Sequence, residues 1–180
     1  MIYVLLAEGF EEIEALTPVD ILRRAGLEVK TVGITGKTIG GSHGIAVEAD
    51  ITPKEANEPI DMLILPGGMP GATNLDQSPA VDALLQSALT QNAHIGAICA
   101  APFILGKRGL LKGKRAVCYP GFEGELIGAK VGEEGLRVIT DGAITTAVGM
   151  GAAGEFALAL LCAIGRKKEA DALAKAAFLQ

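Results

Sequence analysis

The sequence is poor in the residues that bind metals and form disulfides. Its 180 residues include only two histidines, His43 and His94, and three cysteines, Cys99, Cys118 and Cys162. Neither histidine has a second ligand at a spacing typical of zinc sites, so no structural metal is expected. An odd number of widely spaced cysteines, with no signal peptide ahead of them, favours reduced thiols in the cytoplasm.

Basic charge is also scarce. Lys and Arg total 16 against 21 Asp and Glu, which gives a formal net charge of -5 at pH 7. The densest basic cluster, residues 166–168, is typical of a helix start and not of a nucleic-acid interface. The most apolar segment, residues 151–164, is too short to span a membrane. No strand is followed by a Walker or dinucleotide-binding glycine pattern, so no nucleotide cofactor is expected.

Apolar and amphipathic segments alternate along the chain, which is typical of an α/β fold with a mostly parallel sheet. Strands are predicted over 2–7, 27–32, 62–65, 95–98, 115–118 and 136–140. Helices are predicted over 10–25, 79–89, directly after Cys99, over 151–164 (buried, with Cys162 in the core) and over 168–178, and a small hairpin over 40–49. With no repeat and no linker, residues 1–180 are expected to form one domain.

Cys99 ends an apolar run and is followed by two alanines and a proline. Residues 95–98 are short enough for a buried strand, and Pro102 suits a first helical turn, where a missing N–H costs least. Cys99 would then lie at a helix N-terminus, which stabilises a thiolate. Two interpretations stay open: a nucleophile displayed on a sharp strand-to-helix turn, and a small buried side chain.

Glu14 lies inside the apolar stripe of the first predicted helix, whereas Glu12 lies outside it. The stripe is formed by Ala15, Pro18, Val19, Ile21, Leu22 and Ala25. Glu11 shares the face, but an acid in a first turn complements the helix dipole. A carboxylate one turn deeper is costly to bury without a partner, so Glu14 is the acid expected in a functional site.

The predicted strand 62–65 runs directly into Pro66-Gly67-Gly68. Glycines there allow backbone N–H groups to point into a site, although an ordinary strand-to-helix loop also favours glycine. If the strands are parallel, Glu14, Gly67 and Cys99 all lie at the carboxyl edge of one sheet. Open α/β sheets place their sites at that edge.

Four segments carry a family resemblance. They are Ala7-Glu8-Gly9-Phe10-Glu11-Glu12-Ile13-Glu14, Pro18-Val19-Asp20, Leu65-Pro66-Gly67-Gly68 and Ala97-Ile98-Cys99-Ala100-Ala101-Pro102. Together they resemble the ThiJ/PfpI superfamily, in the branch that includes the parkinsonism-associated deglycase. The resemblance covers nearly the whole chain. It implies a flavodoxin-like three-layer sandwich, similar to class I glutamine amidotransferases, and a homodimer with the first helix and residues 40–49 at its interface.

The resemblance also implies a role for each site residue. Cys99 would be the nucleophile and redox-sensitive thiol, and Glu14 its protonated partner and general acid/base. The N–H groups of Gly67, Gly68 and Ala100 would bind an oxyanion. Where the family's namesake has a histidine near its cysteine, this chain offers Tyr119 as the auxiliary group. No histidine follows Cys99 directly, which argues against a Cys–His protease.

Two functions are compatible with these roles. The first is a glyoxalase or protein deglycase that acts on methylglyoxal, glyoxal or their early protein adducts without a cofactor. The alternative is an oxidative-stress sensor or redox-regulated chaperone that works through oxidised Cys99 without turnover. Both need Cys99 and Glu14, so the sequence does not decide between them.

Overall fold

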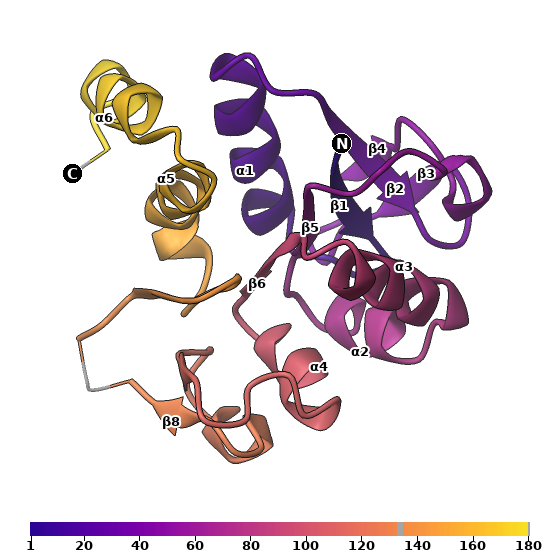
Figure 1. Ribbon diagram of the computed structural model, residues 1–180. Helices are drawn as coiled ribbons and strands as arrows, with labels where there is room; N and C mark the ends of the chain where they lie inside the picture. The colour runs from indigo at the N-terminus through magenta and orange to yellow at the C-terminus, as the bar shows by residue number, and fades with distance from the viewer. Residues whose placement is uncertain (133–134, 180) are drawn as a thin grey trace.

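A computed structural model describes residues 1–132 and 135–179, arranged around one six-stranded sheet (Figure 1). The strand order is β2-β1-β5-β6-β10-β9. The strands are β1 (Ile2–Leu6), β2 (Val29–Gly33), β5 (Met62–Leu65), β6 (His94–Ile98), β9 (Val138–Asp141) and β10 (Ile144–Ala147). All neighbours are parallel except β9, which runs antiparallel to β10 at one edge. The predicted α/β fold with a mostly parallel sheet is confirmed.

Helices cover both faces of the sheet. On one side lie α1 (Glu12–Arg24) and α5 (Ala153–Ala163), with α6 (Lys167–Ala176) packed against α5; on the other lie α2 (Gly71–Asp76), α3 (Pro79–Thr90) and α4 (Pro102–Lys107) (Figure 1). Successive residues of β1 point to opposite faces, so Val4 packs in the core with α1 and α5 while Leu5 packs in the core with α3 and α4. The result is the expected three-layer sandwich.

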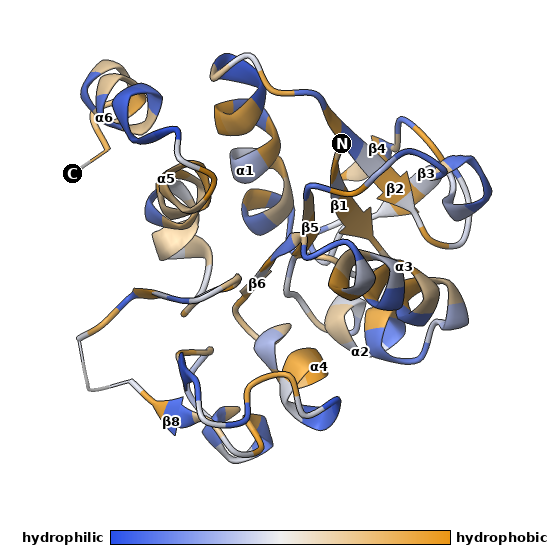
Figure 2. Cartoon of the chain, in the orientation of Figure 1, coloured by the Kyte–Doolittle hydropathy of each residue, from blue (hydrophilic) through white to orange (hydrophobic). Residues whose placement is uncertain are grey.

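Strands β1 and β5 are apolar along their length, whereas α1, α3 and α6 carry hydrophilic residues between their apolar ones (Figure 2). Strands buried on both faces need no alternation of apolar and polar residues, which explains why β1 and β5 read as continuous apolar runs. Among the residues described, no helix combines the length and the apolarity needed to cross a membrane.

Smaller elements surround the sheet. The predicted hairpin is present as antiparallel strands β3 (Thr38–Gly40) and β4 (Ala46–Glu48). The strand predicted over 115–118 is only β7 (Arg115–Ala116), and it pairs with β8 (Lys130–Val131) outside the main sheet. Short 3₁₀ turns cover Pro53–Glu55, Glu123–Glu125 and Met150–Ala152. Three elements, α2, β8 and β10, were not predicted from the sequence.

The burial predicted for the penultimate helix is only half correct. Phe156, Leu160 and Leu161 of α5 are buried against the sheet and α1. Cys162 is exposed, so its prediction as a core residue is wrong. A helix that packs on a sheet buries only one side. Apolar residues on its outer side therefore stay exposed unless another element packs against them.

Candidate functional site

Cys99 lies on a strained turn between β6 and α4. Its φ is 64°, a left-handed conformation that residues other than glycine rarely adopt. Backbone hydrogen bonds hold both sides of the turn: the Cys99 N–H donates to the Ala147 carbonyl at 2.9 Å, and the Cys99 carbonyl accepts from the Tyr119 N–H at 2.8 Å. Strain of this kind persists only where the surrounding structure imposes it, and it concentrates at functional sites.

Glu14 lies beside this turn and is fully buried. Its Oε2 accepts a hydrogen bond from the Gly67 N–H at 3.0 Å. Its Oε1 has no hydrogen-bond partner. Among the residues that the structure describes, no other buried side-chain oxygen or nitrogen lacks a partner. A Cβ placed on Gly67 would lie 2.6 Å from both Cys99 Cβ and Glu14 Oε2. Glycine is therefore required where the carboxyl and the cysteine approach each other.

The first turn of α1 is fixed to the glycine-rich turn after β5. Glu11 is the N-cap residue, and its Oε2 accepts from the Glu14 N–H at 2.7 Å. The Glu11 N–H donates to the Gly67 carbonyl at 3.0 Å. These two bonds set the depth at which Glu14 enters the site, and they give Glu11 the helix-start role expected of it.

The role predicted for Gly67 needs correction. Its N–H is already bonded to Glu14, so it is not available to bind an oxyanion. Burial and Glu14 raise the pKa of the Cys99 thiol, and hydrogen bonding from the Gly68 and Ala100 N–H groups opposes that rise. The turn after β5 and the turn after β6 thus each contain one candidate donor to the sulfur.

Glu14 and Cys99 form a coupled acid pair. Burial raises the pKa of the Glu14 carboxyl to about 7. Burial and the neighbouring Glu14 carboxylate raise the pKa of Cys99 to about 12. The expected stabilisation of a thiolate by the helix N-terminus is therefore outweighed while Glu14 is ionised. When Glu14 is protonated, that opposing charge is absent. The pair therefore loses its first proton near neutral pH, and the carboxyl and the thiol then share the remaining one.

Tyr119 borders the same site from the other side. A Cβ on Gly149 would lie 3.3 Å from Tyr119 Cδ2 and 3.8 Å from Glu14 Oε1, so the loop after β10 separates the ring from the carboxyl. The Tyr119 side chain is half exposed. Tyr119 forms one wall of an open hollow of about 420 Å³ that also includes Leu136, Val148 and Met150.

Glu12 and His43 form a second polar group near the site. Glu12 is buried, contrary to its predicted position outside the apolar stripe. Its Oε1 accepts from the His43 N–H at 2.8 Å, and its Oε2 lies 3.0 Å from His43 Nδ1. Although burial opposes it, these bonds lower the pKa of Glu12 to about 2. Ligand atoms of Glu11, Glu12 and His43 lie within 4.8 Å of one another, but the bonds already made fit a role in fixing the hairpin to α1.

The structure is that of an α/β protein with a cysteine on a strained strand-to-helix turn and a buried carboxyl beside it, at the sheet edge where such folds place their functional sites. Residues 1–163 match the DJ-1/PfpI family, and the chain belongs to that family. The resemblance found in the sequence motifs is thus confirmed.

Individual relatives match over most of their length. Protein dj-1beta of Drosophila melanogaster is 34% identical over 174 residues, which cover 96% of this chain and 93% of the relative. A protein of Pyrococcus abyssi named as a deglycase is 32% identical over 143 residues, 78% of this chain and 85% of the relative. The solved structure of oxidised Toxoplasma gondii DJ-1 has a TM-score of 0.92 and 38% identity, with 98% and 97% of the two chains covered.

The coupling between Glu14 and Cys99 predicts the pH dependence of thiol reactivity. Alkylation of Cys99 by iodoacetamide should increase with pH through about 7, because ionised Glu14 can then accept the thiol proton as the sulfur attacks. Cys118, whose pKa burial raises to about 11, should react only at much higher pH. Mass spectrometry of the separate cysteine peptides measures both rates.

Glu14→Gln should abolish the rise near neutral pH, because the amide cannot accept the proton. Asp20→Asn changes an exposed acid on the same helix and should leave the profile unchanged. An identical midpoint in wild type and Glu14→Gln would contradict the coupling.

Proposed function

We propose that the protein is a cysteine-dependent glyoxalase or deglycase that acts on methylglyoxal, glyoxal or their early protein adducts. The observation that carries this proposal is the pair formed by Cys99 and Glu14, in which a nucleophile has a buried acid with a pKa of about 7 beside it. General acid/base catalysis is most effective when the pKa lies near the working pH. Relatives from two Pyrococcus species are named deglycases, which supports the proposed activity.

The first step is addition of the Cys99 sulfur to the aldehyde carbon. Ionised Glu14 accepts the thiol proton while the carbon–sulfur bond forms, and the carbonyl electrons move to oxygen. The N–H groups of Gly68 and Ala100 bind this oxyanion, which then takes the proton from Glu14 to give a hemithioacetal and leaves the carboxylate ionised again.

The second step moves a proton between adjacent carbons. Glu14 removes the proton from the former aldehyde carbon and returns it to the neighbouring carbon, while the hydroxyl proton of the hemithioacetal passes to the neighbouring carbonyl oxygen. The product is a thioester of the hydroxy acid. Water then hydrolyses the thioester, releases lactate from methylglyoxal or glycolate from glyoxal, and restores the thiol. The net change is addition of one water molecule to the aldehyde.

Early protein adducts would follow the same route. An adduct that releases its aldehyde carbon to Cys99 gives the same hemithioacetal and frees the protein amine or thiol. Deglycation is then a consequence of the glyoxalase chemistry and needs no further catalytic group.

Formation of lactate from methylglyoxal, without added glutathione, tests the proposal. Cys99→Ser should have no measurable turnover, and Glu14→Gln should lose about 10²- to 10⁴-fold in kcat/KM, the usual contribution of a general acid/base. Cys162→Ser removes an exposed thiol that takes no part in these steps, and this variant should retain full activity. Consumption of methylglyoxal at the wild-type rate by Cys99→Ser would exclude the mechanism.

A redox sensor or redox-regulated chaperone is the second candidate, and the unpartnered Oε1 of Glu14 favours it. Oxidation of Cys99 to a sulfinate would supply an oxygen acceptor for protonated Glu14. The three free cysteines fit the reducing cytoplasm that we propose as the location.

Mild peroxide treatment, followed by mass spectrometry, tests the sensor function. Cys99 should gain two oxygens before Cys118 or Cys162 reacts, because Glu14 beside its partly buried sulfur can accept the thiol proton. Equal oxidation of all three thiols would count against a specialised sensor.

We also propose a homodimer whose interface contains α1 and the β3–β4 hairpin. Ile13 and Leu16 of α1 and Ile45 of the hairpin expose 49%, 36% and 56% of their surface and line one shallow apolar hollow. Exposed apolar patches of this kind mark interaction surfaces. Sedimentation at micromolar concentration should show a dimer that Ile13→Glu dissociates. A wild-type protein that is only monomeric would contradict the proposal.

A further inference from the structure

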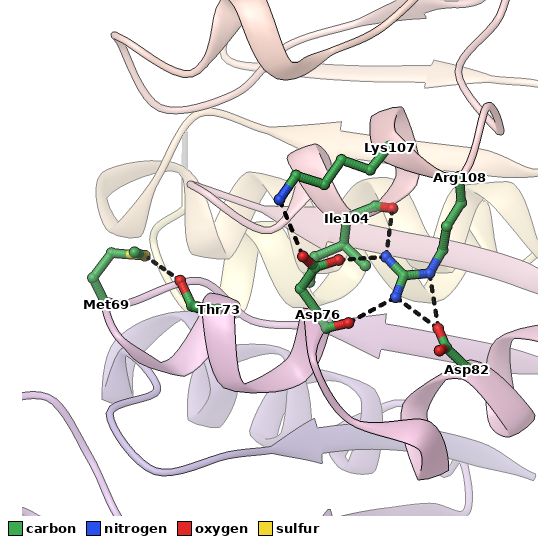
Figure 3. A network of polar contacts seen from close by, with 7 residues as sticks. All are labelled: Met69, Thr73, Asp76, Asp82, Ile104, Lys107 and Arg108. Atoms are coloured by element: carbon green, nitrogen blue, oxygen red, sulfur yellow. Dashed lines mark hydrogen bonds and ion pairs between the residues drawn. The ribbon is translucent and has the colours of Figure 1, made fainter.

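A charged network joins α2 to α4 on the face of the sheet opposite α1. Figure 3 shows the Arg108 guanidinium between two aspartates. Its Nη1 donates to Asp76 Oδ1 at 2.5 Å and to the Ile104 carbonyl at 3.0 Å, and its Nη2 donates to the Asp76 carbonyl at 2.9 Å. Nη2 and Nε also reach Asp82 Oδ1, at 2.6 and 3.0 Å. One side chain thus binds the ends of α2 and α4 and the first turn of α3.

These helices directly follow the two turns that contain Gly68 and Ala100. α2 begins at Gly71, three residues after Gly68, and α4 begins at Pro102, three residues after Cys99. Each helix has only six residues. Helices this short are not stable alone, so their orientation depends on tertiary contacts. A contact that fixes α2 relative to α4 therefore also fixes the turn that precedes each of them.

Asp76 would be unfavourable without this network. It is the last residue of α2, where the negative end of the helix dipole repels a carboxylate. Arg108 and Lys107 offset that repulsion, the latter through a 3.1 Å bond from its Nζ to Asp76 Oδ2. Although burial opposes it, these two cations lower the pKa of Asp76.

The network is more enclosed than an ordinary surface ion pair. The side chains of Asp76 and Arg108 are 17% and 21% exposed, whereas both members of the Asp20–Arg24 pair on α1 are 62% exposed. Enclosed pairs are screened less by water and salt, and the planar guanidinium fixes direction as well as distance. A lysine at position 108 could supply the positive charge but not the planar set of N–H donors that binds both aspartates.

We propose that Arg108 is a positioning residue that holds the turns containing the Gly68 and Ala100 N–H groups in place beside Cys99. It acts through α2 and α4 and does not touch the reacting atoms. At the near end of α2, the Thr73 hydroxyl contacts Met69 Sδ at 3.8 Å, so the helix also supports the residue that follows Gly68 (Figure 3). The inference rests on the site of the proposed function, but it requires no particular substrate.

The pH profile of Cys99 alkylation tests this role, with Arg108→Lys compared with Arg24→Lys, the same substitution at the exposed pair on α1. Arg108→Lys should lower the plateau rate about tenfold, the factor expected when one hydrogen bond to the developing thiolate is weakened. Its midpoint should stay near 7, because Glu14 is unchanged. Arg24→Lys should keep both the plateau and the midpoint of the wild type.

A role limited to stability gives a different result. Local unfolding would expose Cys99, raise its alkylation rate and move the midpoint to that of a free thiol. That outcome, or a folded Arg108→Lys with the wild-type plateau, would overturn the proposal. If Arg108→Lys does not fold, Asp82→Asn is tested in its place. This substitution removes only the ion pair between Arg108 and Asp82, whose side chain is 55% exposed. A smaller fall in the plateau would then support the proposal, and a wild-type plateau would overturn it.

Because alkylation requires no aldehyde, this test is independent of the lactate assay. A protein without glyoxalase activity could still show the altered plateau, and an active glyoxalase could lack it. In an active enzyme, Arg108→Lys should lower kcat and leave KM unchanged, because the two donors bind the oxyanion only after the sulfur has added.

Discussion

The structure of the site depends on one buried carboxyl group, that of Glu14, packed against Cys99. An ionised carboxylate without water is costly unless hydrogen bonds compensate for the lost hydration. Here burial outweighs the hydrogen bond that the Gly67 N–H donates to Oε2, so the pKa of Glu14 rises to about 7 and the group keeps its proton up to about neutral pH. A carboxyl that changes charge near pH 7 is the feature that makes the neighbouring thiol reactive in either proposed function.

The rest of the fold can be understood as the support for this contact. Parallel β1, β5 and β6 bring the start of α1, the glycine-rich turn and Cys99 to one sheet edge. Gly67 leaves room because it has no side chain, and Cys99 accepts a left-handed backbone because β10 and the loop at Tyr119 hold it. The cost of that strain is met by the packing of the sheet. Helices α2 and α4 then fix the two turns relative to each other.

Much of this arrangement could be predicted from the sequence, since it depends on local pattern. Continuous apolar runs identified β1, β5 and β6, and a helical wheel identified Glu14. Strand β10 was missed because Thr145 and Thr146 read as polar, although both are buried and Thr145 bonds to His94 Nε2 at 2.8 Å. The binding of Gly67 by Glu14 and the exposure of Cys162 depend on contacts between distant segments, which periodicity does not contain. The pKa of the pair depends on burial and could not be predicted either.

The central claim is that Glu14 is a buried acid that titrates near neutral pH, and infrared titration tests it most directly. The difference between wild type and Glu14→Gln isolates the absorption band of this protonated carboxyl. We predict that the band disappears with a midpoint near 7, because burial opposes ionisation. A midpoint near the ordinary value of 4.5 would contradict the account, since Glu14 would then be a permanent anion at neutral pH.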